Sequence, residues 1–208
     1  MSMKNSLDYS KIYRPLQNLI FKIFHKRNMH SCFADLIKSN KYDHIIDIGG
    51  ADGVLLNYLK DYNFKSYTCI EPDKTLIENG IKKNIRDNVF FLNKGIERID
   101  IDEINKPNTI IVLVGVIHHI NDEFVVNFLK KISNQSVLTI DGFFYKGMHP
   151  ISYCMKKLDR GDYIRNLDGY KKILKDFFYE KKINYFFRYF SHVIFFKNIK
   201  SDDINKFL

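Results

Sequence analysis

The fold of this chain is decided by the segment Ile45-Ile46-Asp47-Ile48-Gly49-Gly50-Ala51-Asp52-Gly53-Val54-Leu55. An apolar run typical of a buried strand passes directly into a glycine-rich turn, and the pattern of a helix follows it. Glycines at positions 49, 50 and 53 allow the backbone to turn tightly and to approach a ligand at points where a Cβ atom would collide with it. The segment therefore predicts the strand, turn and helix of a nucleoside-binding α/β unit.

Two carboxylates accompany this turn. Asp47 ends the first apolar run, and Glu71 ends the second one, 24 residues later. An acid that binds ribose hydroxyls is expected roughly 20 residues after such a turn, although a glutamate there could also do no more than cap the next helix. A carboxylate at position 47 suits a ligand with ammonium and sulfonium charges better than a pyrophosphate. The turn also lacks the Gly-Lys-Ser/Thr ending of a phosphate-binding loop, which disfavours triphosphates.

Short apolar runs alternate with helical patterns from residue 43 onward, as in a parallel sheet built from strand–helix–strand units. Close to the C-terminus, two strand-like runs have only a short connection and predict an antiparallel hairpin at one edge. The expected fold is a three-layer α/β/α Rossmann-like one, with a seven-stranded and mostly parallel sheet that ends in this hairpin. The predicted strands are 44–48, 66–72, 88–93, 109–116, 136–141, 181–189 and 191–199, with helices at 53–62, 74–84 and 122–133.

The length of 208 residues suits one well-buried domain. Residues 11–40 carry apolar residues at helical spacing, so residues 1–40 are expected to form an N-terminal helical cap ahead of a domain at 41–208. A helix at a membrane surface is the alternative. Residues 150–178 predict two more helical stretches on either side of the polar segment 159–168.

The net charge of +9 would suit an anionic partner such as nucleic acid. The lysines are spread along the chain as single residues or pairs, which favours solvated helix faces over a nucleic-acid footprint. Three distant cysteines without a CxxC pair predict neither a disulfide framework nor a metal site. Because the sequence has no apolar stretch long enough to span a bilayer and no signal-peptide core, a cytoplasmic monomer or homodimer is expected.

Taken together, these features resemble the class I, Rossmann-like S-adenosylmethionine-dependent methyltransferases. Their first motif has the form acid-x-Gly-x-Gly-x-Gly, and their second strand ends in an acid. Residues 110–122, IIVLVGVIHHIND, are similar to the family's fourth-strand segment, an apolar run followed by hHhxD. The match covers about residues 43–141. Two departures are Ala51 in place of the central glycine and Gly95-Ile96 where many members carry Gly-Asp or Asp-Ala.

The resemblance implies S-adenosylmethionine as the cofactor. The turn would surround its methionine portion, the acid after the second strand would bind its ribose, and the loop after the third strand would flank its adenine. An NAD-binding unit shares the turn, but a second half-domain for nicotinamide is not visible. The residues expected at the cofactor are Asp47, Gly49, Gly50, Ala51, Gly53, Glu71, Pro72, Ile96, Glu97 and Gly115.

Two histidines, His118 and His119, follow the fourth predicted strand at the sheet edge where ligands of open α/β sheets bind. Imidazole titrates in the range of a general base, which a hydroxyl acceptor needs. A structural role is equally expected for each, and the sequence does not assign the base between them. The segment lacks the Asp/Asn-Pro-Pro-aromatic motif at this place, which argues against methylation of the adenine amino group.

The acceptor side is expected beyond the fifth strand. Residues 158–165, LDRGDYIR, resemble an LDRGxYxR segment of a subset of small methyltransferases, and the resemblance implies that its arginines and tyrosine line an acceptor pocket. A salt-bridged loop that pins two helices is the alternative. The expected acceptor-binding residues are Asp141, Tyr145, His149, Arg160, Tyr163 and Arg165.

These observations predict methyl transfer to a small molecule at oxygen, such as a sugar, a polysaccharide precursor or a specialised metabolite. An RNA methyltransferase is the first alternative, favoured only by the charge. The second is a non-catalytic, cofactor-binding subunit that supports a partner protein.

Overall fold

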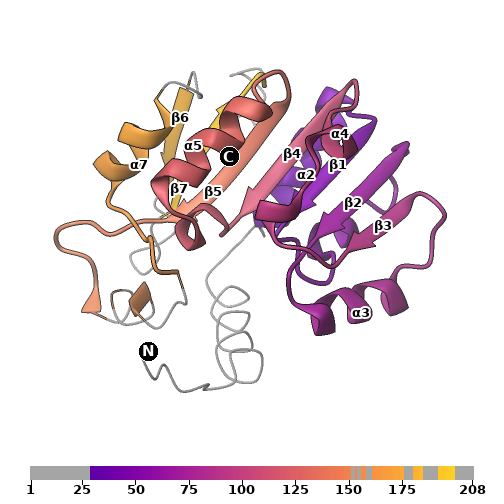
Figure 1. Cartoon of the computed structure of the whole chain (residues 1–208), viewed down its shortest axis with the longest axis horizontal. Coiled ribbons are helices and arrows are strands. Elements are labelled where there is room, and N and C mark those ends of the chain that lie inside the picture. The colour runs from indigo at the N-terminus through magenta and orange to yellow at the C-terminus, as the bar shows by residue number, and fades with distance from the viewer. Residues whose placement is uncertain are drawn as a thin grey trace.

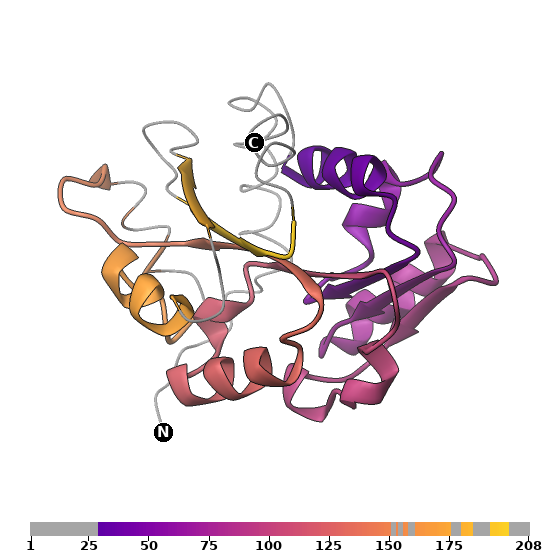
Figure 2. The ribbon, with the colours of Figure 1, turned by 90° about the horizontal axis from the view of Figure 1, so that it is seen from above.

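A computed structural model of the chain describes residues 29–150, 153, 156–157, 161–175, 180–184 and 192–199. They form three layers, with a sheet between two layers of helices (Figures 1 and 2). The α/β Rossmann-like arrangement predicted from the sequence is confirmed. Most of the predicted N-terminal cap, Arg160 and the connection within the C-terminal hairpin lie outside the described residues.

The sheet has the strand order β3-β2-β1-β4-β5-β7-β6. The first five strands along the chain pair in parallel, whereas β7 is antiparallel to both β5 and β6. The strands are β1 (His44–Ile48), β2 (Ser66–Ile70), β3 (Val89–Leu92), β4 (Thr109–Val114), β5 (Ser136–Gly142), β6 (Glu180–Asn184) and β7 (His192–Lys197). Each lies within or close to the run that predicted it.

The central strands β1, β2 and β4 are buried along almost their whole length. Helices cover both faces of a parallel sheet, so its strands consist of continuous apolar runs. The strand order reverses between β1 and β4, which pair directly. Loops that leave two such strands in opposite directions open a crevice at the carboxyl edge, where α/β proteins bind ligands.

One face of the sheet is covered by α2 (Met29–Asn40), η1 (Val54–Tyr58) and α3 (Lys74–Lys83). Phe33, Leu36 and Ile37 of α2 belong to the same buried cluster as strand residues such as Ile45. The last part of the predicted cap therefore packs directly on the sheet.

The helix predicted at 53–62 is wrong in kind, because only a 3₁₀ turn forms at 54–58. Leu56 donates to Gly53 and Leu59 donates to Leu56 through i→i+3 backbone bonds. A 3₁₀ turn places residues three apart on one side, and Leu56 and Leu59 are both buried. Burial of these leucines in successive tight turns takes the place of the expected α-helix.

The other face carries α4 (Ile101–Ile104), α5 (Asp122–Lys131) and α7 (Leu167–Leu174), and Figure 2 shows α5 and α7 across the sheet from α2. Buried residues of α5 and α7, such as Phe128 and Leu174, share one cluster with the strands. Asn121 caps α5 by accepting from the Phe124 amide at 2.8 Å. Two short turns that the sequence did not predict are η2 (Ile96–Arg98) and η3 (Ile117–His119).

Within the described parts of the chain, the helices are too short or too polar to cross a membrane. The same residues contain no group of three or more His, Cys, Asp or Glu side chains placed to hold a metal ion.

Candidate functional site

The turn after β1 is built from residues in left-handed backbone conformations. Gly49, Ala51 and Gly53 have φ angles of 70°, 53° and 78°. A Cβ atom on Gly50 would stand 2.5 Å from Oδ2 of Asp47, so this glycine permits the turn to pack onto the strand end. The left-handed conformation costs a non-glycine residue roughly 1–2 kcal/mol. Ala51 carries this strain at the position where the resembling family has glycine, as is common at ligand-binding turns.

Asp47 lies beneath this turn and is buried. The hydroxyl of Tyr67, on the neighbouring strand β2, donates to its Oδ2 at 2.5 Å. Burial raises the pKa of Asp47 to about 7, the Tyr67 hydrogen bond opposes this increase, and the charge of Glu71 adds to it. The carboxylate predicted at the cofactor is therefore protonated more readily than an ordinary aspartate.

Glu71 connects the end of β2 to the turn after β1. Its Oε2 accepts from the Ala51 amide and its Oε1 from the Asp73 amide, both at 3.1 Å. Asp73 is the N-cap of α3, because its carboxylate accepts from Thr75 and Leu76. A purely helix-capping role for Glu71 is thereby excluded. The two backbone amides, one on each carboxylate oxygen, fix the orientation of this side chain.

The end of β3 is joined to the end of β2. Asn93 donates through Nδ2 to the carbonyls of Glu71 and Pro72, at 3.1 and 2.9 Å. Farther along, Ile96 packs against the core, whereas the Glu97 side chain is 59% exposed. The structure thus brings Pro72 close to the predicted ribose acid, and it leaves Glu97 facing solvent.

The turn after β1 touches the segment after β4. A Cβ atom on Gly49 would stand 2.5 Å from Cγ2 of Val116. Gly115, with φ of 67°, donates its amide to Ile140 of β5 at 2.8 Å. A Cβ atom on Gly115 would contact Cε1 of His118 at 3.5 Å. His118 therefore lies next to the strand end at which the two turns meet.

His118 and Asp141 form a buried pair, with side chains 8% and 2% exposed. The distance from His118 Nδ1 to Asp141 Oδ1 is 2.6 Å, and the His118 amide donates to the same oxygen at 3.1 Å. Thr139 donates to the other carboxylate oxygen at 3.1 Å. An ionised aspartate only accepts, so it fixes the proton on Nδ1 and leaves Nε2 as the basic nitrogen.

The two histidines, which the sequence could not separate, differ in the structure. His119 is exposed, and its ring centroid is 4.2 Å from that of His118. His118 has the carboxylate partner that orients an imidazole. Asp141, predicted to bind the acceptor, is this partner.

The polar segment 161–165 lies against His118. The Tyr163 amide donates to the His118 carbonyl at 2.9 Å. A Cβ atom on Gly161 would overlap the His118 ring and stand 2.8 Å from the same carbonyl oxygen. Glycine at 161 therefore permits the close approach of the two segments, and the Tyr163 side chain stays 42% exposed.

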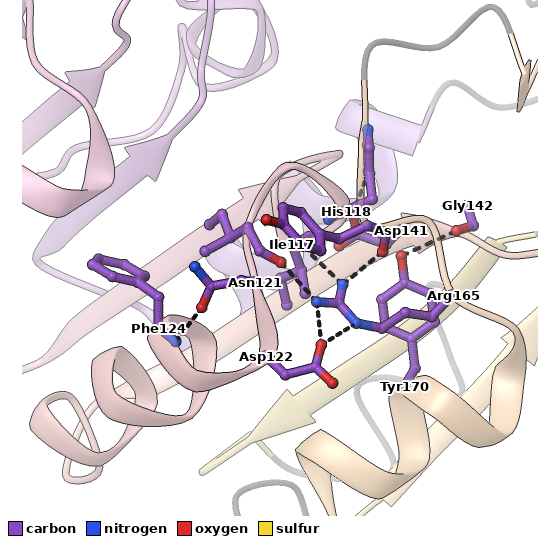
Figure 3. Close-up of polar contacts among 11 residues, drawn as sticks. Ile117, His118, Asn121, Asp122, Phe124, Asp141, Gly142, Arg165 and Tyr170 are labelled. Carbon is purple, nitrogen blue, oxygen red and sulfur yellow. Dashed lines mark hydrogen bonds and ion pairs between the residues drawn. The ribbon is translucent and has the colours of Figure 1, made fainter.

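Arg165 has partners other than those that the resemblance implied (Figure 3). Its guanidinium donates to the Asp122 carboxylate and to backbone carbonyls, and its side chain is 9% exposed. This arrangement is close to the alternative of a loop pinned by salt bridges.

The remaining predicted acceptor residues lie in or near the loop after β5. Tyr145 packs against the core with its ring 5.9 Å from that of Phe143. His149 is half-buried, and its carbonyl accepts from the Tyr153 amide at 3.0 Å.

Sequence reasoning missed four residues of this site: Tyr67, Asp122, Thr139 and Gly161. A tyrosine in a fully buried strand nearly always finds a polar partner, which is the signal that could have found Tyr67. Asp122 is the acid of the hHhxD motif, and its place in that motif is the signal that could have identified it. Gly161 lies within the LDRGDYIR segment but had no role assigned, and Thr139 has no signal in a single sequence.

No protein-family model matches the sequence, and neither does any curated protein. Solved structures do match in fold. A Leishmania major protein described as an S-adenosylmethionine-dependent methyltransferase has a TM-score of 0.58 at 15% identity, covering 86% of this chain and 77% of that one. A candidate O-methyltransferase from Nostoc punctiforme has a TM-score of 0.67 at 10% identity, covering 95% of this chain and 64% of that one.

A third match is the plantazolicin methyltransferase, solved with a triazolic desmethylplantazolicin analogue and S-adenosylhomocysteine. Its TM-score is 0.60 at 14% identity, and the match covers 91% of this chain and 93% of that one. At such low identities the likeness establishes the fold. The chain has the Rossmann-like fold of class I S-adenosylmethionine-dependent methyltransferases.

Proposed function

We propose that this chain is an S-adenosylmethionine-dependent methyltransferase that methylates a small molecule at oxygen. The observation that carries the proposal is the joint placement of Asp47 and Glu71 at the turn after β1. Glu71 is held by the Ala51 amide, and Asp47 lies directly below Gly50. Two acids beside a backbone turn that a ligand can approach closely suit a cationic nucleoside. A polyphosphate is instead bound by lysine and backbone amides.

The described residues fit this cofactor. Glu71 would bind the ribose hydroxyls, and the left-handed turn of Gly49, Ala51 and Gly53 would lie against the methionine portion. When bound, the cofactor supplies a methyl group on a positively charged sulfur, which is open to attack by a nucleophile. The protein then has to hold the acceptor in line and exclude water, and much of the rate can come from this placement.

A hydroxyl acceptor also has to lose its proton, and His118 is the base that we propose. Asp141 holds the proton on Nδ1 through a 2.6 Å contact, so Nε2 is the nitrogen that would accept the acceptor's proton. The ring carbons on either side of Nε2 lie next to Gly115 and Gly161. His118 thus lies between Gly115, which follows β4, and the 161–165 segment.

The solved relatives support a small acceptor, because the plantazolicin enzyme was solved with an organic analogue. An RNA methyltransferase is favoured by the net charge of +9 alone. Binding to tRNA or rRNA with a steep salt dependence would show a surface that follows phosphates and would overturn the small-molecule assignment. A cofactor-binding subunit without catalysis would bind S-adenosylmethionine and transfer no methyl group.

Replacement of Glu71 by alanine tests the cofactor assignment. We expect the dissociation constant for S-adenosylmethionine to rise about 10- to 100-fold, because hydrogen bonds to a charged group contribute about 1.5–3 kcal/mol. Isothermal titration calorimetry measures this change. The matched control is Glu78→Ala on α3, whose side chain is 53% exposed and pairs with Lys74 only at 3.8 Å. The assignment fails if the wild-type chain does not bind the cofactor or if Glu71→Ala binds it equally well.

A further inference from the structure

The turn that carries His118 is short and needs support from outside. The 3₁₀ turn η3 spans Ile117–His119 only. Within the turn the Ile120 amide donates to the Ile117 carbonyl at 3.2 Å, whereas the carbonyls of His118 and Ile120 accept from donors outside it. The 161–165 segment supplies these donors, beginning with the Tyr163 amide on the His118 carbonyl.

Arg165 supplies the other donors to this turn. Its Nη1 donates to the Ile117 carbonyl at 3.0 Å, and its Nη2 donates to the Ile120 carbonyl at 2.7 Å. These carbonyls lie immediately before and immediately after the histidine pair. One guanidinium therefore holds both ends of the segment that places His118 on Asp141 (Figure 3).

The remaining donors of Arg165 are also used. Nε and Nη2 donate to Oδ1 of Asp122 at 2.8 and 2.6 Å, and Nη1 donates to the Tyr163 carbonyl at 2.8 Å. A guanidinium has five N–H donors, and these contacts together occupy all five. Its carbon also lies 5.5 Å from the Tyr170 ring centroid, within range of a cation–π contact. A carboxylate or phosphate of an acceptor could bind here only by displacing one of these partners.

We propose that Arg165 is a positioning residue that fixes the 117–120 turn, and through it the His118 imidazole, and that it does not bind the methyl acceptor. The consequence for catalysis rests on the proposed function, in which His118 is the base. The placement of His118 does not depend on that function. The 161–165 segment thus acts on the reaction through the backbone of the turn.

The test uses the full-length protein labelled with ¹⁵N and observed by NMR spectroscopy. Arg165→Lys keeps the charge and loses the planar five-donor group. We expect it to increase hydrogen exchange of the His118 and Tyr163 amides about tenfold. It should also broaden or remove the downfield resonance of the His118 Nδ1 proton. Asp122→Asn keeps an acceptor oxygen for Arg165, so exchange at both amides should stay within about threefold of wild type.

If Arg165→Lys does not fold, the variant Gly161→Ala and an anion titration of the wild-type protein still test the proposal. Gly161→Ala places a methyl group against the His118 ring and should produce the same loss of the Nδ1 resonance. Sodium acetate and inorganic phosphate should leave the Arg165 Nε resonance of the wild-type protein unshifted. The proposal is overturned if Arg165→Lys and Gly161→Ala both leave the Nδ1 resonance and the exchange rates intact. It is also overturned if either anion shifts the Nε resonance in a saturable manner.

Titration of the same samples with S-adenosylmethionine separates this proposal from the proposed function. Arg165→Lys should bind the cofactor with the wild-type affinity, because its partners lie on η3, α5 and the 161–165 segment and not on the turn after β1. If the wild-type protein does not bind the cofactor, the proposed function fails. The NMR comparison then still decides whether Arg165 places His118.

Discussion

If His118 is the base, we expect the variant His118→Gln to lower the turnover number for methyl transfer about 10²- to 10⁴-fold, the usual contribution of a general base. His119→Gln should stay within about threefold of wild type. The difference follows from the buried Asp141, which contacts Nδ1 of His118 at 2.6 Å and fixes its tautomer. His119 is exposed beside it. Transfer of a radiolabelled methyl group to the acceptor found in a screen of hydroxylated small molecules measures both variants.

The control is Asp141→Asn, which removes the charge and can present an amide hydrogen to Nδ1. It should lose turnover to a degree similar to His118→Gln, because the wrong tautomer then places the proton on Nε2. Calorimetry should give all three variants the wild-type affinity for S-adenosylmethionine. A double variant of His118 and His119 with full turnover would remove both histidines from the mechanism, and with them the preference for an oxygen acceptor.

The predictable part of this molecule is the part that depends on the local sequence pattern. Apolar runs bounded by turn residues located the strands, because both faces of a parallel sheet are buried and a strand then has an apolar side chain at nearly every position. The glycines of the turn after β1 were found because close backbone approach excludes a Cβ atom. Glu71 was found by its spacing from Asp47. The signals for the strands and the turn lie within a few residues of the features that they predict, and the Glu71 signal lies one strand–helix–strand unit away.

The part that could not be predicted depends on contacts between segments far apart in the chain. The difference between His118 and His119 arises from Asp141, which contacts the amide and Nδ1 of His118. The partners of Arg165 are mainly backbone carbonyls, which every residue has, so no residue type marks them. The sequence of the LDRGDYIR segment predicts a polar loop, but it does not show whether an arginine faces a ligand or the protein's own backbone.

We expect Asp47 to make the stability of the fold depend on pH between about pH 4 and pH 7. Burial raises its pKa in the folded protein to about 7, whereas the ordinary value is 3.8. Below about pH 4 the Asp47 carboxyl is protonated in both the folded and the unfolded chain, so its burial does not lower the free energy of unfolding through ionisation. As the pH rises toward 7, only the unfolded chain releases the proton, so the free energy of unfolding falls. At about 1.4 kcal/mol for each pH unit, the loss amounts to about 4 kcal/mol and is complete above pH 7.

Asp47→Asn measures this effect because an asparagine cannot ionise. Urea unfolding at pH 4 and pH 8 should show that the free energy of unfolding of the variant rises by about 3–4 kcal/mol relative to wild type between the two pH values. Titrations shared by both proteins cancel in this comparison.

Asp43→Asn is the control, for which the expected change in relative stability has the opposite sign. The Asn108 hydrogen bond and then Lys65 hold the pKa of Asp43 below its ordinary value, so wild type should gain on that variant as the pH rises through the carboxylate range. An unchanged difference between Asp47→Asn and wild type would mean that Asp47 has the same pKa in the folded and the unfolded chain. The Tyr67 hydrogen bond would then offset burial, and Asp47 would be ionised at neutral pH before a cationic ligand binds.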